Sequence, residues 1–153
     1  MSGITRWATP TWMFFHTFAA KINTTFFEQN RAQCLQIIKM ICECLPCPDC
    51  TIHATRFMKR VNTNNVKTKN DLIDMLFAFH NKVNIRTYKV PATRDILKTY
   101  ETYRMDVAYI NFMHGYPAKY GSIMSGRIST LGKRKGIAKS VQQWMQQHWH
   151  FFQ

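Results

Sequence analysis

Residues 28–50 read EQNRAQCLQIIKMICECLPCPDC, a stretch that contains all five cysteines and two of the prolines. Its apolar residues return every three or four positions, which is the period of a helix with one buried face. Proline cannot continue a helix interior, so Pro46 and Pro48 end that helix and let another begin near Pro48. We therefore expect a helix from about Glu28 to Glu43. Its buried stripe consists of Cys34, Ile37, Ile38, Ile41 and Leu45.

The helical period continues on both sides of this stretch. We expect a first helix capped by Thr9 or Thr11, a third from Pro48, a fourth from Asn70-Asp71 and a short fifth over 93–105. Inward residues are Trp12, Phe15, His16, Ala19 and Ala20, then Cys50, Ala54, Phe57 and Val61, then Leu72, Ile73, Leu76, Phe79, His80 and Val83. The absence of a sustained two-residue alternation excludes the thioredoxin fold. The prediction is an all-α protein, a four-helix bundle plus a short fifth helix with a C-terminal tail.

Length and charge divide the chain. Its 153 residues, 46% of them hydrophobic, can form one modest domain with a real core, which excludes wholesale disorder. Five of the six glycines fall at residue 115 or later, and glycine interrupts rather than builds helices. We therefore predict a domain over residues 1–106 and a basic, glycine- and aromatic-containing extension over 107–153. The net charge of +13 points to an anionic partner, for which the extension is the candidate region.

All five cysteines lie between residues 34 and 50, whereas the cysteines of disulfide-stapled secreted domains spread along the chain. Cys47-Pro48-Asp49-Cys50 can close a small disulfide, and the start of a helix stabilises a thiolate at Cys47. Cys44 and Cys47 have the same spacing, so the sequence alone does not single out one pair. Cys34 and Cys42 are interpreted as small core residues, and Cys44 is left open.

Metal sites fit these cysteines less well. Zinc could take Cys42, Cys44, Cys47 and Cys50, with His53 nearby, but structural zinc sites usually join two separated ligand pairs. An iron–sulfur cluster needs a further cysteine after C-x2-C-x2-C, and residues 51–153 contain none. We therefore predict no metal ligands.

Two further motifs flank the cysteines. A W-x3-H motif at residues 12–16 puts an indole and an imidazole one helical turn apart on one face. An H-N-x-V-N motif at residues 80–84 ends the fourth helix, and the basic Arg86 and Lys89 follow it. Taken singly, the first indicates a packed core with one satisfied histidine and the second a polar helix end. Their order is more informative: W-x3-H, then P-C-x-x-C, then H-N-x-V-N, with about thirty residues between neighbours.

This order resembles the Erv/ALR family of FAD-linked sulfhydryl oxidases over about residues 7–105, and most of all its compact members from large nucleocytoplasmic DNA viruses. The resemblance implies a dithiol oxidase that passes electrons through Cys47 and Cys50 and FAD to O₂, giving H₂O₂. Cys50 would be the sulfur beside the flavin, and Cys47 the one that meets substrate. FAD would lie in the mouth of the bundle against Trp12, His16, His80, Asn81, Val83, Asn84, Arg86 and Lys89. Flat rings suit a flavin, and the last two cations suit its pyrophosphate.

The resemblance also carries expectations about partners and location. Cys42 and Cys44 lie on expected helix rather than in a mobile shuttle segment, so a separate dithiol protein, thioredoxin-like, is expected to deliver the electrons. Family members usually form homodimers. No stretch approaches the ~20 apolar residues of a membrane span, and residues 1–12 lack an apolar signal core. If the chain is viral, host cytoplasm or the virion is the expected location.

A small helical nucleic-acid-binding module is the alternative. The charge of +13 supports it, as do aromatics among cations: Tyr116, Tyr120, Trp144 and Trp149. It leaves unexplained why Trp12, His16, Cys47, Cys50, His80 and Asn84 occur together.

Overall fold

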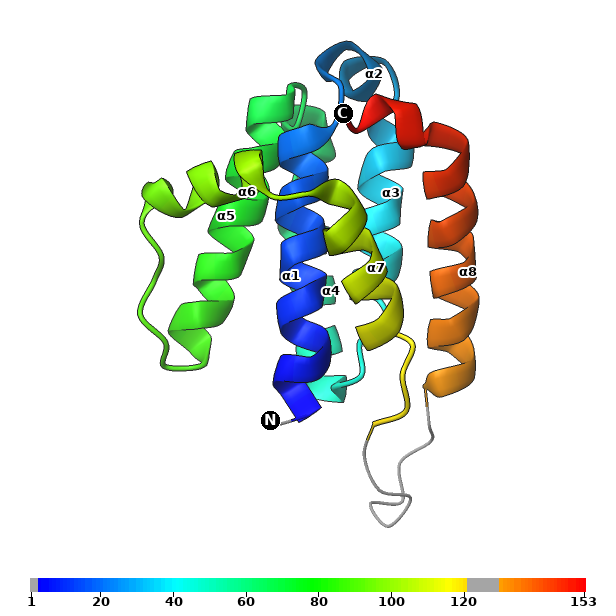
Figure 1. Ribbon diagram of the computed structural model, residues 1–153. Coiled ribbons are helices and arrows are strands. Elements are labelled where there is room, and N and C mark those ends of the chain that lie inside the picture. Colours follow the sequence, from blue (N-terminus) through cyan, green and yellow to red (C-terminus); the bar gives the residue numbers. More distant parts are fainter. Residues whose placement is uncertain (1–2, 121–129) are drawn as a thin grey trace.

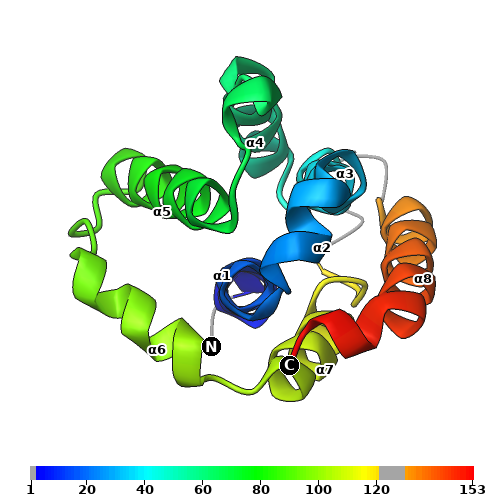
Figure 2. The ribbon, with the colours of Figure 1, turned by 90° about the horizontal axis from the view of Figure 1, so that it is seen from above.

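The computed structural model describes residues 3–120 and 130–153, and these form helices without any strand (Figure 1). The predicted all-α class is confirmed. Helix α1 (Gly3–Lys21) lies near the middle, with the other long helices arranged around it (Figure 2). It packs on α5 (Lys69–Arg86), α6 (Leu97–Thr102) and α7 (Met105–Gly115). Within the described ranges, no helix combines the length and the apolar character needed to cross a bilayer.

The remaining elements complete the bundle. They are α2 (Thr24–Gln29), α3 (Arg31–Cys42), α4 (Pro48–Arg60), α8 (Leu131–His148) and the 3₁₀ turns η1 (Thr63–Asn65), η2 (Arg94–Ile96) and η4 (Trp149–Phe151). Helix α3 packs on α4 and also on α8. The pair α3–α4 therefore joins the cysteine-bearing segment to the C-terminal half of the chain.

Helix α1 begins earlier than the sequence indicates. Thr11 is not its cap, because the Thr11 hydroxyl donates within the helix to the carbonyl of Trp7 at 2.6 Å. Pro10 lies inside the helix and has no N–H to bond the carbonyl of Arg6. Helix α7 approaches at this point, where a Cβ on Gly115 would lie only 2.5 Å from that carbonyl oxygen. Glycine at 115 therefore permits the close contact of α1 and α7.

Short polar side chains set two boundaries that the apolar period does not show. The predicted helix over 28–43 is two helices, because Asn30 has a non-helical backbone between α2 and α3. The cap of α5 is Thr68 rather than the predicted Asn70-Asp71. The Thr68 hydroxyl accepts from the Asp71 N–H while the Asp71 carboxylate accepts from the Thr68 N–H, a reciprocal capping box.

The described residues of 107–153 are mostly helical and enter the same core as the rest. Phe112, Tyr116, Val141 and Met145 are all 0% exposed. The last turn returns to the start of α2, where the N–H of Asn23 donates to the carbonyl of Phe151 at 2.7 Å. The boundary predicted at residue 106 falls inside α7. The segment expected as a tail thus covers one side of the bundle.

Candidate active site

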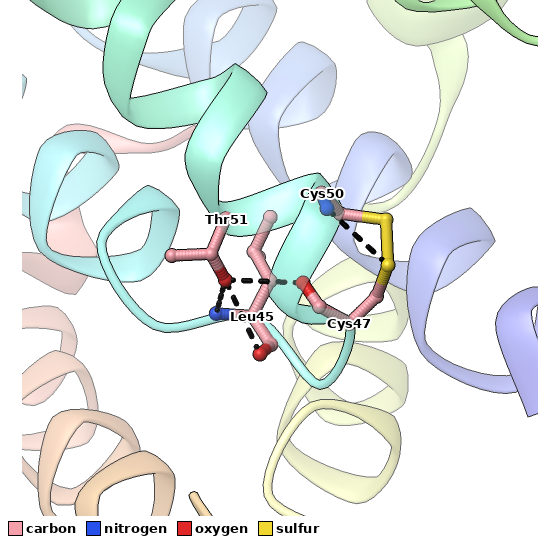
Figure 3. Close-up of a disulfide and its surroundings, with 4 residues drawn as sticks. All are labelled: Leu45, Cys47, Cys50 and Thr51. Carbon is pink, nitrogen blue, oxygen red and sulfur yellow. Dashed lines mark hydrogen bonds between the residues drawn. A yellow bond between two sulfur atoms is a disulfide. The ribbon is translucent and has the colours of Figure 1, made fainter. Parts of the chain in front are cut away.

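Cys47 and Cys50 form a disulfide at the start of α4, with their Cα atoms 5.2 Å apart (Figure 3). The local sequence explains this placement. Pro48 occupies the first turn, where its missing N–H costs nothing, and Cys47 is the N-cap. The Cys50 N–H donates to the Cys47 sulfur at 3.2 Å. A thiolate at Cys47 would receive the same stabilisation from the helix N-terminus.

The loop that leads into this disulfide is held by Thr51, one residue past it (Figure 3). The Leu45 N–H donates to the Thr51 hydroxyl oxygen at 2.9 Å. The hydroxyl proton can go to the carbonyl of Cys47, at 3.2 Å, or of Leu45, at 3.4 Å. The sequence analysis missed Thr51, although a threonine in the first turn of a helix is a known signal for local side-chain–backbone bonding.

The other three cysteines are free thiols and buried. Burial raises the pKa of Cys34 to about 12 and also raises that of Cys42, with the Glu43 carboxylate adding to the shift in Cys42. Both thiols are therefore protonated and unreactive at neutral pH, in agreement with their interpretation as core residues. Cys44, left open by the sequence, is only 3% exposed. No group of three or more His, Cys, Asp or Glu side chains suited to a metal occurs in residues 3–120 and 130–153.

The two flanking motifs meet between α1 and α5. His16 and His80 lie 64 positions apart in sequence, and Nε2 of the first is 2.9 Å from Nδ1 of the second. Trp12 stacks on His80 with ring centroids 4.0 Å apart and planes 4° from parallel. Tyr100 of α6 stacks on His16, with ring centroids 4.4 Å apart. Tyr100 was missed, because its position on a short helix carries no motif.

Both imidazoles are held neutral. Burial, with a smaller contribution from His80, lowers the pKa of His16 to about 3. Burial, with a smaller contribution from Lys89, lowers the pKa of His80 to about 4. A hydrogen bond between two imidazole nitrogens needs one donor and one acceptor, which neutral rings provide. The pair therefore offers flat, uncharged rings at neutral pH.

The rings continue from α1 through α5 to α4. Trp12 packs edge-on against Phe79 at 4.9 Å, and Phe79 stacks on Phe57 at 4.4 Å. Phe57 lies on the same helix as the disulfide, two turns after Cys50. The structure thus links the W-x3-H motif, the H-N-x-V-N motif and the cysteine-bearing helix through packed aromatic side chains.

The asparagines of the H-N-x-V-N motif fix the loop that follows α5. Asn81 donates to the carbonyl of Ala92 at 2.9 Å and accepts from its N–H at 2.8 Å, while Asn84 donates to Asn81 at 3.2 Å. The Lys89 N–H donates to the carbonyl of Asn84 at 2.8 Å. Tyr88 in this loop has φ 61° and is 98% exposed. Asn81 and Asn84 therefore position the backbone that carries Lys89.

A cleft of about 340 Å³ opens between α4 and α5. Its lining combines apolar and cationic side chains: His53, Phe57, Phe79, Val83 and Ile85 with Arg56, Arg60, Lys82 and Arg86. The structure thus brings predicted residues Val83 and Arg86 together with three cations that the sequence analysis did not single out. Helical spacing from Cys50 could have found Arg56 and Arg60. Trp12, His16 and His80 do not line this cleft, and Phe79 and Phe57 connect them to it. Planar rings and clustered cations are the groups that suit a flavin nucleotide, whose rings are planar and whose pyrophosphate is anionic.

Comparison with known proteins identifies the family of this chain. The model of the Erv1 / Alr family matches residues 9–104, which include all three motifs. The search of curated proteins and the search of solved structures each found no match to the chain. The family match spans more than half of the sequence. This chain therefore belongs to the Erv1/Alr family, a family of FAD-binding sulfhydryl oxidases.

Proposed function

We propose that this protein oxidises dithiols to disulfides through Cys47 and Cys50 and passes the electrons to O₂, giving H₂O₂. The observation that carries the proposal is the Cys47–Cys50 disulfide at the N-terminus of α4, within the segment matched by the family model. Both cysteines are partly exposed, whereas the other three are buried. Of the five cysteines, Cys47 and Cys50 are therefore the two that can meet a protein substrate without unfolding.

Thiol–disulfide exchange at this pair proceeds in balanced steps. A substrate thiolate attacks the Cys47 sulfur, the Cys47–Cys50 bond breaks, and Cys50 leaves as a thiolate. The second substrate thiol loses its proton and attacks the mixed disulfide, which releases oxidised substrate and leaves Cys47 as a thiolate. The helix N-terminus stabilises that thiolate, so in this second step Cys47 leaves more readily from the mixed disulfide than the substrate sulfur would. The cysteine pair has then gained the two electrons lost by the substrate.

Residues of α1, of α5 and of the loop after α5 would hold the FAD. Trp12, His16 and His80 supply the stacked neutral rings, and Val83 lines the cleft. Arg86 and Lys89 supply positive charge for the pyrophosphate. Asn84 and Asn81 fix the loop that carries Lys89. When bound, FAD supplies the two-electron acceptor that restores the disulfide and reacts with O₂.

A separate dithiol protein, thioredoxin-like, is the proposed electron donor. Cys34, Cys42 and Cys44 are all buried, so none of them can act as a mobile shuttle to Cys47. The alternative of nucleic-acid stacking finds less support, because Tyr116 is 0% exposed and Tyr120, Trp144 and Trp149 are partly buried.

The test is an absorbance spectrum of the purified full-length protein. We expect a flavin band that bleaches when dithiothreitol is added without oxygen and returns on admission of air, with O₂ consumed and H₂O₂ formed. A folded, colourless protein that takes up no added FAD would contradict the proposal.

A further inference from the structure

The loop over residues 43–47, which we call the redox loop, joins α3 to the Cys47–Cys50 disulfide. A loop without secondary structure keeps its shape only where its backbone groups find fixed partners. Thr51 provides one set of partners from within the family segment. A second anchor comes from outside it: the Tyr116 hydroxyl donates to the carbonyl of Cys44 at 2.5 Å. Residue 116 lies twelve positions beyond the family match, which ends at 104.

Tyr116 is itself rigidly held. Its side chain is 0% exposed, and its ring stacks on Phe112 with centroids 5.1 Å apart. Its carbonyl accepts a hydrogen bond from Arg134 of α8 at 2.7 Å. Arg134 is 2% exposed and also donates to the carbonyl of Ala118 at 2.7 Å and to the Thr130 hydroxyl at 2.9 Å. A continuous series of hydrogen bonds thus runs from α8 through Arg134 and Tyr116 to the redox loop.

We propose that Tyr116 is a positioning residue for the redox pair: it fixes the redox loop so that the Cys47 sulfur stays over the first turn of α4, and the C-terminal helices thereby set the reactivity of Cys47. The sulfur of Cys47 receives the Cys50 N–H only while residues 44–47 keep their path into the helix. If the carbonyl of Cys44 is released, the cap loosens and the Cys47 thiolate loses part of its stabilisation.

The test measures the thiol directly and does not depend on oxidase activity. Tyr116→Phe removes the hydroxyl and keeps the ring. Tyr120→Phe is the matched control, because the Tyr120 hydroxyl also donates to a carbonyl, that of Gly115, which lies outside the redox loop. Each protein is reduced, freed of reductant and treated with iodoacetamide at pH 7, and alkylation of Cys47 is followed by mass spectrometry of its peptide. We expect Tyr116→Phe to slow alkylation by about two- to fivefold, the factor typical of a helix N-terminus acting on an anion, and Tyr120→Phe to leave it unchanged.

Two further measurements separate positioning from general loosening. Hydrogen exchange of the peptide covering the redox loop should speed up in Tyr116→Phe, while exchange in α1 stays the same. Thr51→Val should also slow the alkylation of Cys47, and Thr51→Ser, which keeps the hydroxyl, should keep the original rate. If Tyr116→Phe does not fold, Arg134→Lys, which shortens the reach to the carbonyl of Tyr116, serves in its place.

The outcomes are distinct. The proposal is supported if alkylation of Cys47 is slower in Tyr116→Phe and unchanged in Tyr120→Phe. Equal rates in both variants overturn it, as does a slow Thr51→Val beside an unchanged Tyr116→Phe, because the loop would then matter without the C-terminal helices. The proposal uses the proposed function only in taking Cys47 as the exchanging thiol. A protein that lacks oxidase activity but shows the alkylation difference would refute the function and keep the role of Tyr116.

Discussion

The α4–α5 side of the molecule and the α7–α8 side share one hydrophobic core but contribute opposite kinds of residue to function. The first carries the disulfide, the cationic cleft and one of the paired histidines, and its functional side chains are mostly partly exposed. The second carries no recognisable motif and buries large side chains such as Phe112 and Met145. A motif therefore marks chemistry, while the packing that holds the motif in place can come from residues without one.

The largest loss of activity is expected at the redox pair, on the α4–α5 side. Cys47→Ser and Cys50→Ser should each abolish thiol-dependent O₂ consumption, because a single thiol cannot re-form the disulfide. Cys34→Ser is the control: this thiol is buried, with its pKa raised to about 12, and activity should persist. If Cys34→Ser by itself abolished activity, the interpretation of Cys34 as a core residue would be wrong.

The next effect lies on the α7–α8 side and concerns stability. Phe112 is 0% exposed and stacks on Phe14 of α1 with centroids 4.6 Å apart. Phe112→Ala should lower the free energy of unfolding by about 3–5 kcal/mol, the usual cost of removing a buried phenyl ring. Ile110→Ala on the same helix, where the side chain is 52% exposed, should cost well under half as much. Urea denaturation measures both, and equal small losses would mean that α7 is dispensable to the fold.

A pH effect of intermediate size is expected on the motif side. Burial lowers the pKa of His16 from 6.5 to about 3, so between these values the unfolded chain binds a proton that the folded protein does not. Stability therefore falls as the pH drops below 6.5. At pH 5 the loss relative to pH 7 from His16 should be about 2 kcal/mol.

The check is urea denaturation at the two pH values. His16→Gln should reduce the pH dependence, whereas His150→Gln, which changes an exposed histidine in the last turn, should retain it. An unchanged pH dependence in His16→Gln would show that another group is responsible.

The smallest effect on stability is expected at two exposed ion pairs, one on each side of the molecule. Arg94–Asp74 bridges η2 and α5, and Arg104–Asp106 lies at the start of α7, both on exposed side chains. Asp74→Asn and Asp106→Asn should each change the free energy of unfolding far less than Phe112→Ala does, because water screens exposed ion pairs, and the effect should shrink further in high salt. A large loss for Asp74→Asn in urea denaturation would indicate that its ion pair holds η2 against α5, and a large loss for Asp106→Asn would indicate that its pair with Arg104 stabilises the start of α7.

Several helix boundaries could not be predicted from apolar spacing, because side-chain hydrogen bonds decide them. Asn30, whose side-chain amide donates to the carbonyl of Phe26 at 3.0 Å, ends α2 before α3 begins, and Thr68 rather than Asn70 begins α5. The two motif histidines were expected at the site, but their direct contact was not, since 64 residues separate them. Thr51 and Tyr100 escaped notice because neither belongs to a motif. Whether the predicted cofactor residues bind FAD stays a prediction.

The all-α class and the family follow from the sequence, because apolar period and motif order are properties of the chain. Two cysteine pairs share the C-x-x-C spacing, and the structure shows that Cys47 and Cys50 are the pair that is joined. The place of the residues beyond 106 in the fold depends on tertiary packing. Their glycines and cations suggested an extension, but helix propensity and charge do not reveal which distant surface a helix will cover. Burial of Phe112 and Met145, the close approach at Gly115 and the hydrogen bond from Tyr116 to Cys44 depend on contacts between segments far apart in sequence. Such contacts are set by packing of the whole bundle, which no local pattern encodes.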